Sequence, residues 1–141
     1  MPLSTSKGEG NFYLLPNGVF WLDEQGAHVA PTDRYAAHGR VTLATQSGPL
    51  LLDAGQLHPA FQEGSTSLRV RSGVGVNAQG RVVLVLSRDR VSFHATATLF
   101  RDALACPNAL YLDGEISAIS APRIEPRERH EYAGLLVVKQ R

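Results

Sequence analysis

The stretch RVVLVLS, from Arg81 to Ser87, is the feature that most limits how this chain can fold. Its five central residues are all apolar, so a strand formed here would be apolar on both faces. Strands of that kind normally lie inside a sheet that is covered on both sides. We therefore expect a central strand over residues 81–87, with neighbouring strands and covering elements supplied by the rest of the 141 residues.

The other strand signals are short apolar runs separated by Gly, Pro and Asn, which interrupt regular pairing. They fall at residues 12–15, 18–22, 41–45, 50–52, 68–76, 109–112 and 134–138. Because short turns join most of these runs, they favour pairing between sequential strands. The pattern predicts an α+β fold: a mixed, mainly antiparallel sheet with one principal helix.

One segment has helical periodicity. Phe93, Ala97, Phe100 and Leu104 recur at steps of four, three and four, and Ser92 precedes them as an N-cap. We expect a helix over about residues 95–104 that packs these side chains against the strand at 81–87 or its neighbour.

Composition limits the classes of partner and site. The 14 basic and 13 acidic residues nearly cancel, which argues against a nucleic-acid or membrane-surface protein. The single cysteine, Cys106, excludes an internal disulfide, and the histidines have no standard zinc spacing, so we expect no metal and no cofactor. The first ten residues lack the features of a signal peptide, and localisation stays undecided. We expect residues 1–10 to be a disordered start and residues 11–141 to form a single domain.

Three polar interruptions follow apolar strands, where a rigid element can position side chains for chemistry. They are the loop Gln46-Ser47-Gly48-Pro49, the segment from Arg71 to Gly75, and the segment from Asp113 to Ser117. Each also has a structural interpretation, as a turn, a bulged strand and an Asp-Gly hairpin turn respectively. Spacing alone favours the structural interpretation of each segment, because such turns are common.

The sequences of four segments resemble those of the phosphodiester glycosidase family, which includes the mannose 6-phosphate uncovering enzyme. The segments are GNFYLLPNGVF (10–20), ATQSGPLLLDAG (44–55), RSGVGV (71–76) and LFRDALACPNALYLDGEIS (99–117). They span most of the chain between Gly10 and Ser120, and the last is the most specific. Family members usually have an asparagine-containing motif before the counterpart of Gly10, and this chain has none. Three explanations are open: the chain is a fragment, its open reading frame is assigned a start that is too late, or it is a family member that binds ligand with little catalysis.

The resemblance implies a hydrolase that cleaves a sugar from a phosphodiester or a related glycoside. A buried arginine can hold phosphate oxygens bidentately, which suits Arg71. A carboxylate beside the anomeric carbon can stabilise an oxocarbenium-like transition state or direct water, which suits Asp113. The residues expected to bind the substrate are Gln46, Ser47, Gly48 and Ser117.

Glu115 is a further catalytic candidate. In a regular strand it would lie on the same side as Asp113, roughly 6 to 7 Å away, a separation that suits an inverting pair of carboxylates. Gly114 between them favours a turn instead, so Glu115 ranks below Asp113. His94 is as well explained by a solvated or capping role as by catalysis, and Cys106 is better explained as a buried apolar residue than as a nucleophile.

Two hypotheses about function follow. The first is a hydrolase whose partner is a small carbohydrate or sugar-phosphate ligand, with Asp113 as its central carboxylate. The second is a non-catalytic ligand-binding or assembly module of the same fold. In the second case an exposed sheet edge would pair with another molecule, and a homodimer would be expected.

Overall fold

The structure is a computed structural model that describes residues 14–124 and 136–138. Two antiparallel sheets and a single α-helix confirm the α+β class. The strands are β1 (Gly18–Asp23), β2 (Gly26–Pro31), β3 (Leu43–Ser47), β4 (Leu50–Asp53), β5 (Gln56–Leu57), β6 (Ser72–Val76), β7 (Val82–Leu86) and β8 (Asn108–Tyr111). The helical elements are the 3-10 turn η2 (Thr32–Arg34), helix α1 (Phe93–Thr98) and the π-helical turn η3 (Leu99–Ala103) that continues α1.

The strands form two sheets instead of the one expected. The smaller has the order β2-β1-β3 and the larger the order β5-β4-β8-β6-β7. Every ladder between these strands is antiparallel. Strand β8, the last in sequence, lies between β4 and β6, so it brings residues 108–111 to the middle of the larger sheet.

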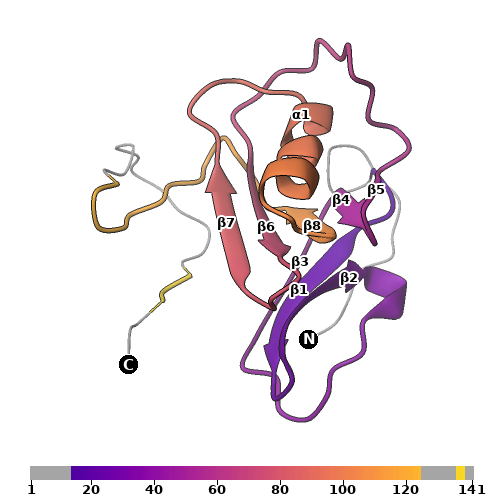
Figure 1. Cartoon of the computed structure of the whole chain (residues 1–141), viewed down its shortest axis with the longest axis vertical. Coiled ribbons are helices and arrows are strands. Elements are labelled where there is room, and N and C mark those ends of the chain that lie inside the picture. Colours follow the sequence, from indigo (N-terminus) through magenta and orange to yellow (C-terminus); the bar gives the residue numbers. More distant parts are fainter. Residues whose placement is uncertain (1–13, 125–135, 139–141) are drawn as a thin grey trace.

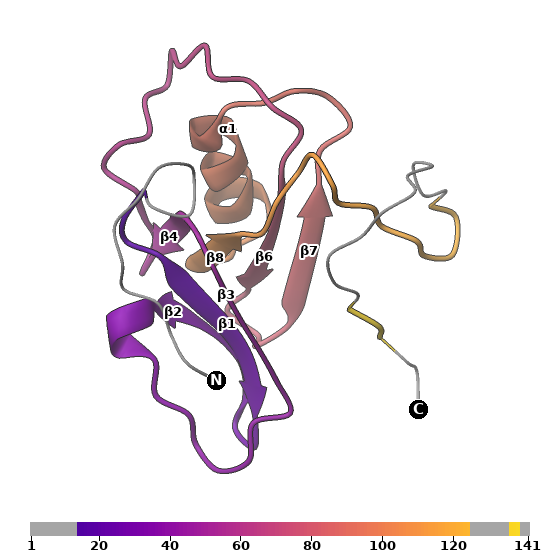
Figure 2. The ribbon, with the colours of Figure 1, turned by 180° about the vertical axis from the view of Figure 1, so that it is seen from behind.

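The larger sheet is covered on both faces (Figures 1 and 2). On one face, α1 and η3 pack through Ala97 and Phe100 against a cluster that includes Leu52, Ala109 and Tyr111. On the other face the smaller sheet forms a second cluster, which consists of Phe20, Val29, Leu50, Val74 and Leu110 with partly buried neighbours. Consecutive residues of β8 thus serve opposite faces, as the alternation of a strand requires.

The helix is placed as its periodicity predicts. Ser92 is its N-cap, and the Ser92 Oγ accepts a hydrogen bond from the Ala95 N–H at 3.0 Å. Phe100 is 0% exposed. Its ring lies against β6 because Gly73 and Gly75 carry no side chain there: a Cβ on either would come within 3.0 Å of that ring. The expected packing on a neighbour of residues 81–87 is therefore confirmed.

The expectation of a central strand over residues 81–87 is wrong. Among the described residues, β7 is the end strand of the larger sheet. Val83 and Val85 pack towards the helix, whereas Val82 and Leu84 are each 41% exposed. The smaller sheet covers the neighbouring strands but leaves this face of β7 open, so an apolar composition on both faces does not here mark a covered strand.

Other boundaries differ from the expectations. The strand predicted at 68–76 is regular only from Ser72, and Leu14 and Leu15 form a bend. Residues 136–138 have no regular structure, and residues 1–13 and 134–135 lie outside the described part of the chain. Strands β2 and β5 were not predicted. No helix within the described ranges is both long and apolar enough to cross a membrane.

Candidate functional site

An open pocket of about 500 Å³ lies where two of the three predicted polar segments, 46–49 and 113–117, come together. Its walls are the junction between β3 and β4, the residues after β8, and the residues before β6. The lining residues are Ser47, Gly48, Arg69, Tyr111, Leu112, Asp113 and Glu115. Ser47, Gly48, Asp113 and Glu115 were expected at one site from the sequence, and the fold places all four on this pocket.

The junction of the two sheets fixes one wall of the pocket. Ser47 ends β3, and its Oγ donates a hydrogen bond to the Leu112 carbonyl oxygen at 3.1 Å. The Leu112 N–H donates in turn to the Ser72 carbonyl oxygen at 3.0 Å. The ends of β3, β8 and β6 are thereby joined, and the segment after β8 is held at the pocket although it belongs to no strand.

Asp113 begins a tight turn. Its Oδ1 accepts a hydrogen bond from the Glu115 N–H at 3.1 Å, so the carboxylate has a structural role in the turn. Its other oxygen, Oδ2, has no hydrogen-bond partner among the described residues. Both Asp113 and Glu115 are exposed. The chain turns between the two carboxylates, so the regular-strand geometry considered for an inverting pair does not occur.

Gly114 makes this turn feasible. A Cβ on Gly114 would lie 1.6 Å from the Val70 carbonyl oxygen, which means that the two backbones touch where only glycine fits. The Gly114 N–H donates to the Tyr111 hydroxyl oxygen at 3.3 Å. The turn is therefore tied both to the segment before β6 and to the last residue of β8.

Ser117 lies behind the turn. Its hydroxyl donates to the Asp113 carbonyl oxygen and lies 2.7 Å from the Oγ of Ser72. Ser72 was not predicted as a site residue, yet it is buried and hydrogen-bonds to the backbone of Asp113. The sequence signal that could have identified Ser72 is its position directly after Arg71, at the start of the glycine-rich strand β6.

Arg71 does not line the pocket and is 1% exposed. Its Nε donates to the Val91 carbonyl oxygen at 2.9 Å and its Nη2 to the Ser67 carbonyl oxygen at 3.0 Å. The guanidinium carbon lies 3.5 Å from the centroid of the Phe93 ring. Burial lowers the pKa of Arg71, while Tyr111 opposes that shift.

Gln46 also points elsewhere. Its Nε2 donates to the Thr32 Oγ1 at 3.2 Å, on the side of the smaller sheet that lies towards η2. Successive residues of a strand alternate between faces, so Gln46 and Ser47 cannot both face the pocket. The structure brings Ser47 to the pocket and directs Gln46 to the end of β2.

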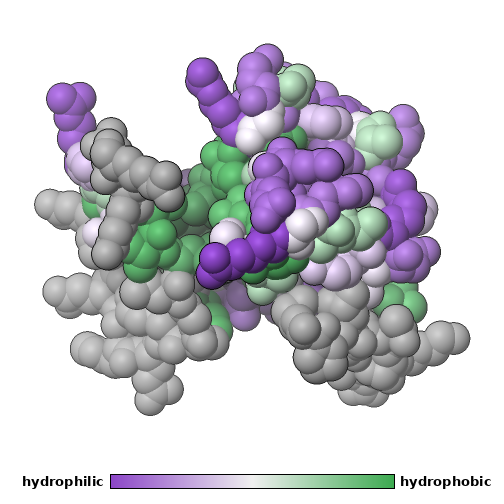
Figure 3. Space-filling model, turned by 90° about the horizontal axis from the view of Figure 1, so that it is seen from below, coloured by the Kyte–Doolittle hydropathy of each residue, from purple (hydrophilic) through white to green (hydrophobic). Residues whose placement is uncertain are grey.

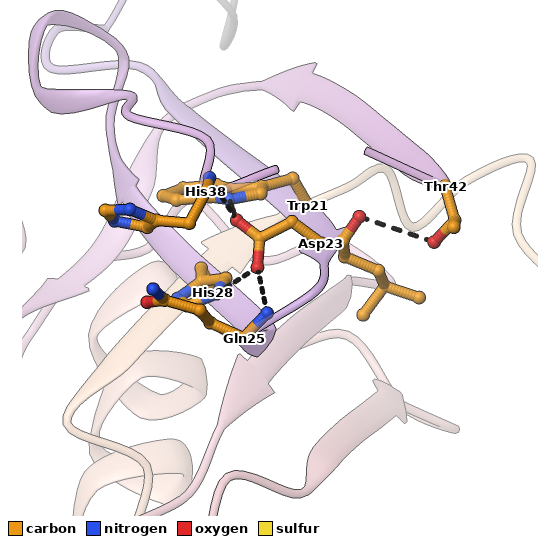
Figure 4. Close-up of polar contacts among 7 residues, drawn as sticks. Trp21, Asp23, Gln25, His28, His38 and Thr42 are labelled. Atoms are coloured by element: carbon orange, nitrogen blue, oxygen red, sulfur yellow. Dashed lines mark hydrogen bonds and ion pairs between the residues drawn. The ribbon is translucent and has the colours of Figure 1, made fainter. Parts of the chain in front are cut away.

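A second polar cluster surrounds Asp23 at the end of β1 (Figure 4). Its carboxylate accepts hydrogen bonds from Trp21 Nε1 at 3.0 Å and from the backbone N–H groups of Gln25 and His38 at 2.9 and 2.8 Å, and Nε2 of His28 lies 3.0 Å away. Burial acts to raise the pKa of Asp23, but these hydrogen bonds outweigh it and hold that pKa well below its usual range. The cluster fastens the loop at His38 to the β1–β2 hairpin and takes no part in the pocket.

The remaining chemical candidates have structural environments. The Nδ1 of His58 accepts the Ala60 N–H at 3.1 Å, and its Nε2 lies 2.7 Å from the Leu15 carbonyl oxygen, which implies a neutral ring with the proton on Nε2. Cys106 is buried, and burial raises the pKa of its thiol, which does not favour a nucleophile. In the part of the chain that the structure describes, no group of three or more His, Cys, Asp or Glu side chains is placed to hold a metal ion.

Fold and site together define an α+β domain with a polar pocket at the ends of its strands. The sequence profile of the phosphodiester glycosidase family matches residues 2–120, and the chain belongs to that family. It is 34% identical over 115 residues to the uncharacterised protein YigE of Escherichia coli (strain K12), a match that covers 82% of this chain and 45% of YigE. The chain thus spans less than half the length of that relative. No solved structure matches it.

Proposed function

We propose that the pocket binds and hydrolyses a sugar phosphodiester or a related glycoside, with Asp113 as the key carboxylate. The observation that carries the proposal is that residues 99–117, which lie within the part of the chain that matches the family, end in the turn that forms a wall of the pocket. This turn presents two exposed carboxylates beside hydroxyl and backbone groups. Sugar hydroxyls are recognised by such mixtures of acceptors and donors.

Asp113 is suited to the central role because one carboxylate oxygen is fixed while the other is unengaged within the described residues. The hydrogen bond from the Glu115 N–H orients the group, and Oδ2 remains to face a ligand. A preorganised negative charge stabilises a developing oxocarbenium ion or directs a water molecule to the anomeric carbon. Phosphate leaves with little need for protonation, so electrostatic stabilisation is the main requirement.

The supporting groups follow from their positions. The Ser47 hydroxyl donates a hydrogen bond to the Leu112 carbonyl oxygen. The lone pairs of the Ser47 Oγ can then accept a hydrogen bond from a sugar hydroxyl. Gly48 lines the pocket without a side chain and lets a ligand approach the backbone closely. Arg71 and Ser117 lie one layer behind, and we assign Ser117 to supporting the turn through the Asp113 carbonyl.

The test is the hydrolysis of an N-acetylglucosamine phosphodiester, followed by the release of free sugar. The proposal predicts turnover by the parent protein. Because Glu115 lines the same pocket, Glu115→Gln is expected to reduce turnover, whereas Glu63→Gln, at an exposed carboxylate outside the pocket, should leave it unchanged. Absence of turnover in the parent, with the protein folded, would remove the hydrolase assignment.

A second candidate function is assembly, and the open face of β7 favours it. Seen from below, hydrophobic residues reach the surface among polar ones (Figure 3). The exposed apolar residues of β7 are Val82 and Leu84, on an edge strand without an internal charge, proline or bulge of the kinds that normally protect an edge. An antiparallel pairing with a second copy, centred on Leu84, would set Val82 opposite Leu86 of that copy and keep the apolar rows together.

Light scattering tests the assembly candidate. It predicts a dimer for the parent protein and a monomer for Leu84→Asp, because a buried charge at the centre of the paired strands is costly. Leu99→Asp, at another exposed apolar residue, serves as the control and should leave the dimer intact. A monomeric parent at concentrations of about 100 μM, at which even weak dimers form, would exclude this function.

A further inference from the structure

Two arginines separated by one residue have opposite environments at the proposed site. Arg69 is exposed and lines the pocket with Asp113 and Glu115. Arg71 is buried and lies behind the pocket wall. The family resemblance favoured Arg71 as the phosphate-binding residue. The difference in burial between Arg69 and Arg71 bears on which of the two guanidinium groups a ligand can reach.

The donors of Arg71 are largely committed inside the protein. Two of its nitrogens bind the carbonyl oxygens of Val91 and Ser67, and its flat face stacks on Phe93. The third nitrogen, Nη1, is buried and has no partner among the described residues. Because Nη1 is shielded from solvent, a ligand could reach Arg71 only if the groups that cover it moved. Arg71 therefore holds the segment at Ser67 and the segment at Val91 together.

The backbone of Arg69 is fixed while its side chain is available. Arg69 and Val91 exchange two backbone hydrogen bonds, at 3.1 and 2.8 Å. The side chain makes one hydrogen bond, from Nη1 to the Leu68 carbonyl oxygen at 2.8 Å. Its Nε and Nη2 have no partner within the described ranges. These two donors point the same way on a planar guanidinium and match two oxygens of a phosphate.

The charged residues that line the pocket are one cation, Arg69, and two carboxylates, Asp113 and Glu115. No ion pair joins Arg69 to Asp113 or Glu115 in the described residues, although all three line the same pocket. The pocket therefore has a cationic side and an anionic side. A ligand with a phosphate at one end and hydroxyls at the other fits both, because the phosphate accepts hydrogen bonds and the hydroxyls donate to carboxylates.

We infer that Arg69 binds the phosphate of the ligand and that Arg71 is a positioning residue for the pocket wall. The inference rests on the proposed function for the identity of the ligand, but its anion-binding part can be measured without turnover. It assigns phosphate specificity to a residue that the sequence did not single out. Arg69 precedes the segment that resembles the family, so the resemblance gave no reason to select it.

Calorimetric titration with inorganic phosphate and with N-acetylglucosamine 1-phosphate tests the inference. Arg69→Gln is expected to weaken binding about 10- to 100-fold, the range for a lost charge-assisted contact, and Arg69→Lys to weaken it less. Arg81→Gln, at an exposed arginine outside the pocket, should bind like the parent. Arg71→Lys is expected to lower the melting temperature because it loses carbonyl bonds and stacking, while its folded fraction still binds phosphate.

Several outcomes would overturn the inference: a parent that does not bind phosphate, an Arg69→Gln variant that binds it normally, or an equal loss in Arg81→Gln. An Arg71→Lys variant that melts like the parent but no longer binds phosphate would assign the anion to Arg71. Turnover separates this inference from the proposed function. If phosphate binding depends on Arg69 but the protein shows no turnover, only the proposed hydrolase activity is excluded. If Arg69→Gln leaves the hydrolysis of charged phosphodiesters unchanged, only the assignment of Arg69 as the phosphate-binding residue is excluded.

Discussion

The hydroxyl of Ser72 pairs with both backbone polar groups of Asp113: its Oγ accepts the Asp113 N–H at 3.0 Å and donates to the Asp113 carbonyl oxygen. The buried Ser72 side chain, at the start of β6, thus supplies hydrogen bonds to the Asp113 backbone after the backbone pairing of β8 has ended. Through this contact the larger sheet controls the position of the carboxylate at the pocket.

Ser72→Ala should therefore destabilise the protein and loosen the pocket. The Asp113 N–H would lose its acceptor and the Asp113 carbonyl would keep only the Ser117 hydroxyl, and a buried polar group left unsatisfied costs about 1 to 3 kcal/mol. Chemical denaturation measures the change, with Ser120→Ala at an exposed serine as the control. If both variants unfold at the same denaturant concentration as the parent, the hydrogen bonds of Ser72 do not hold the turn.

Gly114→Ala should be more damaging because the added methyl group would meet the Val70 carbonyl oxygen at 1.6 Å. The backbones must move apart, and we expect a loss of at least about 4 kcal/mol in the free energy of unfolding, the range of severe steric substitutions. Gly64→Ala is the matched control, since a Cβ there meets no atom within 4 Å. A Gly114→Ala protein as stable as Gly64→Ala would contradict the close contact.

Phe100→Ala tests the packing of the helix on the larger sheet. The ring is 0% exposed, and its removal should cost about 3 to 5 kcal/mol. The neighbouring Leu99 is 42% exposed, so Leu99→Ala should cost much less. Equal denaturation midpoints for the two variants would show that the helix does not depend on this ring.

The acid dependence of stability should change when Asp23 is replaced. Its pKa is lowered in the folded state, so the unfolded chain takes up the proton first as the pH falls below about 4, and the contribution of Asp23 is lost with further acidification. At pH 7 Asp23→Asn should melt below the parent, because its amide nitrogen cannot accept all the hydrogen bonds made to the carboxylate.

Towards pH 2 the difference in melting temperature between Asp23→Asn and the parent should narrow. Thermal unfolding between pH 2 and pH 7 measures this, with Asp33→Asn at an exposed carboxylate as the control. A gap that stays constant over this range would show that the titration of Asp23 is not linked to folding.

The sequence was sufficient to predict the fold class, the helix and the convergence of part of the site. Phe93, Ala97 and Phe100 carried a helical period that local spacing reveals. Ser47 and Asp113 could be expected at one site because each lies at the end of an apolar run, although β3 and β8 belong to different sheets. These predictions depend on local sequence patterns or on the resemblance of the sequence to the family.

The remaining features depend on three-dimensional arrangement. RVVLVLS has the composition of a central strand, but among the described strands β7 pairs with β6 alone and so lies at the end of the larger sheet. The sequence LRVR around Arg69 and Arg71 likewise does not show which arginine is buried. That choice depends on Phe93, 22 positions after Arg71, and on carbonyl groups in separate loops.

The most direct test of the account is the joint effect of Asp113→Asn on stability and hydrolysis. Asparagine retains the side-chain oxygen that accepts the Glu115 N–H, so the melting temperature should stay within a few degrees of the parent, equivalent to about 1 kcal/mol or less. The negative charge is lost, so hydrolysis of an N-acetylglucosamine phosphodiester should fall by at least about 100-fold. A variant that melts much earlier, or that hydrolyses the substrate at the parent rate, would show that Asp113 is a structural turn residue and not the key carboxylate.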